Sequence, residues 1–125
     1  AAAASGQFVI KKQPDIVQRF LKGLLEGTVY FKTHPKESIE IIKKLYLREG
    51  ELDDELATAI YNDIALNLAP KLYPTMDAVA NVYQEALYQD KESSRVAPLE
   101  LWDLHHLRQI DDSGFIRELY GNKAV

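Results

Sequence analysis

The stretch "QPDIVQRFLKGLLEG", residues 13–27, predicts a protein built from amphipathic helices. Pro14 suits a first helical position because its missing N–H group would be unpaired there, and Asp15 complements the positive end of the helix dipole. Apolar residues then recur every three to four positions along one stripe: Ile16, Val17, Phe20, Leu21, Leu24 and Leu25. We therefore predict a long helix from Pro14 to about Lys32.

The rest of the chain predicts four further helices from proline starts, polar caps and apolar stripes. They are expected at residues 35–47, 53–69, 75–89 and 103–114, with a terminal turn at 115–120. The expected caps are Thr33 or His34 for the first of these, Asp53 for the second and Thr75 for the third, and Asp103 starts the last. Residues 90–98 read as a loop and residues 99–102 as a short apolar turn. Only "QFVI", residues 7–10, has strand character, so the predicted fold is all-α, with five to six helices and one short N-terminal strand remnant.

The continuity of the stripes across capped helices predicts a structure that is at least about 60% helical. It also predicts six buried side chains: Phe20, Leu24, Ile42, Ile60, Ile64 and Val82. Gly23 and Gly27 lie four residues apart inside the first helix, where each glycine costs about 1 kcal/mol relative to alanine. They indicate either that another element crosses closely at this place or that the helix simply tolerates them.

Composition excludes several classes of protein. The 125 residues fit one domain, and a net charge of -4 gives no cationic surface for a nucleic acid. There is no cysteine, which excludes disulfides, thiolate nucleophiles and cysteine-based zinc sites. No apolar run approaches the length of a membrane span. Residues 1–7, which include four alanines, read as an expression remnant or a linker, and residues 8–125 as a helical C-terminal domain or subdomain.

The residues with reactive side chains form no recognisable catalytic or metal motif. His105 and His106 are adjacent, so a helix should point them about 100° apart, and Asp111 and Asp112 follow without a metal-ligand spacing. One surface histidine and one packed histidine are the simpler reading. The remaining candidates are Ser93, Ser94, Trp102, His34 and the tyrosines. Loop positions for the serines, a capping role or none for His34 and core positions for the aromatic residues are simpler interpretations than a nucleophile or a binding surface. We predict no catalytic, cofactor-binding or metal-binding residue, and no ligand-binding residue is identified.

In their order along the chain, the segments resemble the C-terminal third of a known protein family. They are an apolar strand end, residues 11–46, "YPTMDAVANVYQEAL" at 73–87 and "LWDLHHLRQIDDSGFIRELY" at 101–120. The chain resembles the periplasmic substrate-binding proteins of ABC transporters for nitrate, sulfonates, taurine and thiamine precursors. The landmarks are Gln13-Pro14, Gly27, Tyr30, His34-Pro35, Pro74-Thr75, Asp103 and Ser113-Gly114-Phe115. His34 and Gln13 depart from the asparagine that is usual in the family, but both residue types can cap a helix.

The resemblance implies a part of an α/β two-lobe fold, in which a solute is held between the lobes. It implies a non-enzymatic role in which a small anion or an aromatic metabolite is captured and delivered to the permease. Its implied partners are that solute, bound through α/β lobes that this chain lacks, and the membrane subunits of the transporter. The implied location is periplasmic, or extracellular and membrane-associated. The alternative from another class is a free-standing helical module for protein interaction.

The wide stripe of the first helix predicts that this chain associates with itself. Phe8, Val9 and Ile10 would form a strand whose backbone groups have no partner in the chain. Apolar side chains of the first helix would remain exposed beside it. Both features predict a two-fold symmetric homodimer with paired strands or swapped segments.

Overall fold

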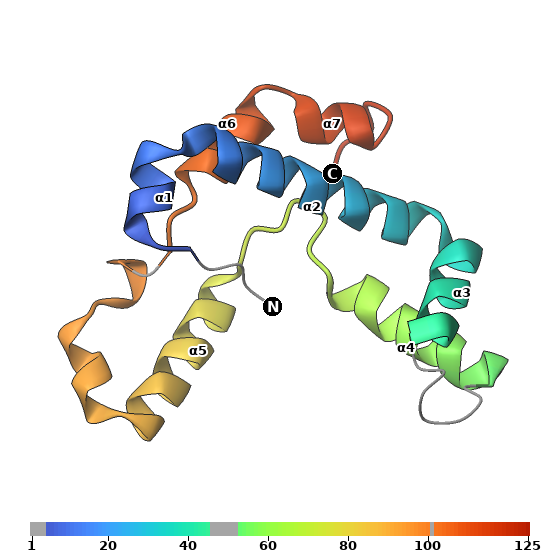
Figure 1. The fold of residues 1–125 in the computed structure, drawn as a ribbon. Coiled ribbons are helices and arrows are strands. Elements are labelled where there is room, and N and C mark those ends of the chain that lie inside the picture. The colour runs from blue at the N-terminus through green and yellow to red at the C-terminus, as the bar shows by residue number, and fades with distance from the viewer. Residues whose placement is uncertain (1–4, 46–52, 101) are drawn as a thin grey trace.

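The computed structural model describes residues 5–45, 53–100 and 102–125, and within these ranges the protein is all-helical (Figure 1). The described residues are 76% helical and contain no strand. The elements are α1 (Gln7–Lys12), α2 (Pro14–Thr33), α3 (Pro35–Leu45), α4 (Asp54–Asn67), α5 (Met76–Gln89), the short 3-10 helices η1 (Lys91–Arg95) and η2 (Pro98–Glu100), α6 (His105–Asp112) and α7 (Phe115–Leu119). The all-α prediction is therefore confirmed.

The predicted strand at residues 7–10 is wrong, because these residues form most of α1. The backbone N–H groups of Val9 and Ile10 both donate to the carbonyl of Gly6, at 3.0 and 3.2 Å. A strand without a neighbour would leave its backbone groups unpaired, whereas a helical turn pairs some of them locally. The dimer of paired strands that was expected from this segment loses its basis.

The starts of α2, α4 and α5 follow the predicted chemistry. Pro14 occupies the first turn of α2. The Asp53 carboxylate accepts a hydrogen bond from the Leu56 N–H group at 2.7 Å, and the Thr75 hydroxyl accepts one from the Ala78 N–H group at 3.1 Å. Both side chains thus satisfy one of the free N–H groups at a helix start. The last helix begins two residues later than predicted, at His105, and the Asp103 carboxylate accepts from the N–H group of that residue.

The centre of the fold is a small cluster around Leu25, which is completely buried. Leu107 and Ile110 of α6 and Ile116 of α7 pack against it from the C-terminal end of the chain. In Figure 1, α6 and α7 accordingly lie along α2. This body is formed mainly by residues that are about 80 to 90 positions apart in the sequence, so its helices require one another for burial.

Most of the side chains predicted to be buried are exposed. Ile42 is buried and Ile60 is half-buried, but Phe20, Leu24, Ile64 and Val82 are exposed. In α2 the buried residues are Leu25, Thr28 and Val29. Leu25 and Val29 lie on the opposite side of the helix from Ile16 and Phe20. A stripe shows that a helix has an apolar face, but it does not show which of two apolar faces meets a neighbour.

Two arms extend from this body (Figure 1). In the first arm α3 packs against α4, and the Lys43 ammonium group of α3 pairs with Asp54 at the start of α4. The second arm consists of α5, which packs mainly against η1 and η2, where the sequence predicted a loop and an apolar turn. Apolar side chains remain exposed on the arms: Ile41, Leu45, Leu56, Ile64, Leu66, Met76, Val82 and Tyr88.

Of the two explanations offered for Gly23 and Gly27, the structure favours glycines that the helix simply tolerates over a close crossing of another described element. A Cβ atom added at either glycine would meet nothing within 4 Å. Both glycines therefore lie on an open surface of α2.

Candidate functional site

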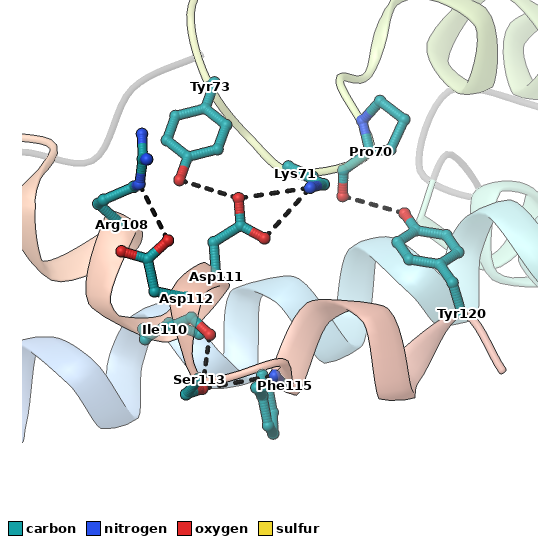
Figure 2. A network of polar contacts seen from close by, with 10 residues as sticks. All are labelled: Pro70, Lys71, Tyr73, Arg108, Ile110, Asp111, Asp112, Ser113, Phe115 and Tyr120. Carbon is teal, nitrogen blue, oxygen red and sulfur yellow. Dashed lines mark hydrogen bonds and ion pairs between the residues drawn. The ribbon is translucent and has the colours of Figure 1, made fainter. Parts of the chain in front are cut away.

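The segment between α4 and α5, residues 68–75, is bound to the C-terminal helices by a network of polar side chains (Figure 2). Asp111 of α6 is its centre. The Lys71 ammonium group donates to both carboxylate oxygens of Asp111, at 3.2 and 3.4 Å, and the Tyr73 hydroxyl donates to one of them at 3.2 Å. The Lys71 and Asp111 side chains are only 34% and 20% exposed, so this ion pair is partly shielded from solvent.

Tyr120 binds the same segment at the residue before Lys71. Its hydroxyl donates to the carbonyl of Pro70 at 3.0 Å. Between Lys71 and Tyr73, Leu72 adopts a left-handed backbone with a φ angle of 64°. This conformation is strained for a residue with a large side chain. Leu72 and Tyr73 also pack against the cluster around Leu25, so apolar burial and the polar network together fix the segment.

Both tyrosines of this network hold their protons more firmly than usual. Burial, and then the hydrogen bond to Asp111, raise the pKa of Tyr73 above its ordinary value of 10.0. Burial also raises the pKa of Tyr120. In each case the neutral hydroxyl is the donor, so loss of its proton removes the hydrogen bond.

We expect the protein to lose stability above about pH 10, when these two tyrosines ionise. Each raised pKa means that the unfolded tyrosine loses its proton first, so the contribution is complete below the ordinary pKa and disappears as the pH rises through the raised value. Urea unfolding measured at a series of alkaline pH values checks this. Tyr73→Phe should be less stable at neutral pH and should flatten the alkaline loss. Identical pH dependence in the two proteins would show that Tyr73 does not take part.

The four residues considered for a metal or acid–base site are not brought together. Arg108 donates to Asp112 at 3.0 Å, while Asp111 belongs to the network above. His105 and His106 do lie side by side, with ring centroids 3.8 Å apart, although a 100° separation was expected. In the described residues there is no group of three or more side chains suited to holding a metal ion.

Each histidine has its own partner, which explains why the two rings form no joint site. The exposed His105 ring lies with Nδ1 at 2.9 Å from an Asp103 carboxylate oxygen, and this hydrogen bond lowers the pKa of Asp103. His106 is 4% exposed and donates from Nε2 to the carbonyl of Ile10 at 3.2 Å, which joins α6 to α1. The expectation of one surface and one packed histidine is confirmed. The buried Nδ1 atom of His106 has no hydrogen-bond partner among the described residues.

The other candidates from the sequence are scattered. His34 lies between α2 and α3, where its ring stacks on Tyr30 at 4.2 Å. Ser94 is exposed in η1, and the side chain of Ser93 lies outside the described part. Trp102 is half-buried. The described tyrosines divide between the two roles that the sequence allowed. Tyr61 is buried, Tyr73 and Tyr120 pack half-buried against the cluster around Leu25, and Tyr83 is half-buried, whereas Tyr30 and Tyr88 are exposed.

Two contacts that hold the fold together have no signal in the sequence. The Lys32 ammonium group donates to the carbonyls of Ala65 and Leu68, both at 2.6 Å, and so joins the end of α4 to α2. The second is the bond between Lys71 and Asp111, in a segment where the sequence indicated only a turn. Both pairs are more than 30 residues apart, and each lysine looks locally like any other surface lysine.

By its fold, the described part of the chain is an all-helical protein with an open arrangement of helices around α2. A polar network fixes the segment between its two arms. No protein-family model matches the chain, and neither a curated protein nor a solved structure matches it significantly. In the described parts of the chain, no helix combines the length and the apolar character required to cross a bilayer.

Proposed function

We propose that this chain is the helical C-terminal part of a solute-binding protein of an ABC importer. The order of landmarks from Gln13-Pro14 to Ser113-Gly114-Phe115 supports this proposal. A helix start, a second helix start and a closing turn follow one another along this chain in the same order as in that family. The network around Asp111 would then have a structural task, since it fixes the two arms relative to the body.

The exposed apolar side chains of the two arms carry the proposal. On α4, Leu56 is 50% and Leu66 is 84% exposed, and on α5, Met76 is 69% and Tyr88 is 89% exposed. A protein that works alone in water rarely leaves so many large apolar side chains on its helices uncovered. The α/β lobes of a binding protein are the kind of body that would cover them.

In this function no covalent bond is made or broken. The α/β lobes capture a small anion or an aromatic metabolite, such as nitrate, a sulfonate, taurine or a pyrimidine precursor. The helices of this chain support the lobes and offer their outer surfaces to the membrane subunits of the importer. The protein acts outside the cytoplasmic membrane, in the periplasm or attached to the outer side of the cell.

The same exposed side chains favour a second candidate, a helical module that binds another protein. The second arm suits this role, because α5 packs mainly against η1 and η2 and keeps Val82 and Tyr88 accessible. The encoding gene separates the two candidates. A long upstream coding region with a signal peptide and alternating strands and helices supports the importer component. A stop codon directly before residue 1 would contradict it and support the module.

A further inference from the structure

Helix α2 carries a second apolar face on the side away from the core. Its members are Ile16, Phe20, Gly23, Gly27 and Tyr30, which we call the outer seam. Ile16, Phe20 and Tyr30 are 47%, 57% and 45% exposed. The buried side chains Leu25 and Val29 lie on the opposite face. A helix that is apolar on two opposite faces is suited to lie between two packed layers, and the described residues supply only one of them.

The spacing of the outer seam fits a helical partner. Its residues follow one another at intervals of four, three, four and three, which is the alternation that keeps one seam of a helix against another helix. The repeat covers about two heptads, from Ile16 to Tyr30. A contact of this length is short, so an affinity in the micromolar range is expected.

The glycines of the outer seam allow another backbone to approach closely. A Cβ atom added at Gly23 or Gly27 would lie in open space. Because both glycines lack a side chain, the helix surface beside Phe20 is lower than Phe20 itself. When two copies of α2 run antiparallel about a centre between Lys22 and Gly23, Phe20 of each copy falls between the heights of Gly23 and Gly27 of the other. The large ring then fills the space that the missing side chains leave.

The charges beside the outer seam select a second copy of the chain as the partner. Arg19 and Glu26 are both exposed and lie seven residues apart, at the same heptad position on one edge. In an antiparallel pair related by a two-fold axis, this edge of one copy lies against the same edge of the other copy. With the centre given above, Arg19 of each copy lies opposite Glu26 of the other, which gives two such pairs in the dimer. In a parallel pair Arg19 and Glu26 would instead face Leu24 and Phe31 on the other edge of the partner helix.

We propose that the outer seam is a homodimer interface, in which the α2 helices of two copies pack antiparallel about a two-fold axis. The interface replaces the strand pairing that the sequence suggested, because it requires only elements that are present. It concerns the 125-residue chain itself and does not depend on the proposed function.

Sedimentation equilibrium on the chain and on four variants tests the proposal. The chain should form dimers at micromolar concentration. Phe20→Asp should weaken the dimer at least about tenfold, because it places a charge in the seam. Arg19→Glu and Glu26→Arg should each weaken it severalfold, because each creates two like-charge contacts. The double variant Arg19→Glu/Glu26→Arg should restore the original affinity. The three substituted positions, Arg19, Phe20 and Glu26, are exposed in the monomer, so circular dichroism should show unchanged helicity.

Gly27→Ala provides a matched measurement that separates folding from association. In the monomer the new methyl group meets nothing and favours the helix, so the thermal midpoint measured at low concentration should rise. In the dimer it occupies the space for Phe20 of the other copy, so the dissociation constant should increase severalfold. A monomer at about 1 mM would overturn the proposal. A double charge variant no tighter than the single variants would overturn the antiparallel arrangement.

Discussion

Replacing Leu25 by alanine is expected to lower the free energy of unfolding by about 2–5 kcal/mol. Leu25 is completely buried, and it is the contribution of α2 to the cluster with Leu107, Ile110 and Ile116. Alanine favours a helix at least as well as leucine, so the loss would come from packing and from the cavity that remains. For a domain with a total stability of about 5–15 kcal/mol, this is a large share.

Urea unfolding followed by circular dichroism measures this effect, and Leu66→Ala is its matched control. Leu66 is 84% exposed on α4, so the same substitution should change stability by less than about 0.5 kcal/mol. Equal effects of the two substitutions would show that the cluster around Leu25 is not the centre of the fold.

Replacing Lys32 by methionine is expected to release the end of α4 from α2, at a cost of about 1.5–3 kcal/mol. The Lys32 ammonium group donates to the carbonyls of Ala65 and Leu68 at the C-terminal end of α4, where helix carbonyls have no partner within the helix. Methionine keeps the apolar stem and removes the donor. A positive charge at this end of a helix is also favourable, and it would be lost.

Amide hydrogen exchange resolves this local effect. In Lys32→Met the amides of α4 should exchange faster, whereas those of α6 should change little, because α6 belongs to the body around Leu25. Lys44→Met is a suitable control, since Lys44 is exposed in the last turn of α3. Unchanged exchange in α4 of the Lys32 variant would mean that other contacts hold this arm.

The sequence predicted those features that depend on neighbouring residues. Pro14 starts α2, and Asp53 and Thr75 cap α4 and α5, because each of these signals acts within one helical turn. The all-helical fold follows from the same local signals. The strand assigned to residues 7–10 failed because its apolar run is too short to distinguish a strand from a helix.

Burial and the candidate site were harder to predict, because both depend on distant parts of the chain. The stripe through Ile16, Phe20 and Leu24 is real, but α6 and α7 pack on the opposite face of α2. Asp111 and Lys71 lie 40 residues apart, and nothing near either residue indicates the other. The heptad spacing of the outer seam was readable in the sequence, but its significance depends on the exposure that the structure shows.

The most direct test of the proposed function is titration calorimetry with nitrate, taurine, an alkylsulfonate and a pyrimidine precursor. It compares the 125-residue chain with the complete product of its gene. Under the proposed function, the complete product should bind one of these solutes with micromolar affinity, because a cleft between two α/β lobes would supply the binding groups. The chain alone should bind all of them no more tightly than millimolar. Micromolar binding by the chain alone would contradict the proposal, and so would the absence of binding by the complete product.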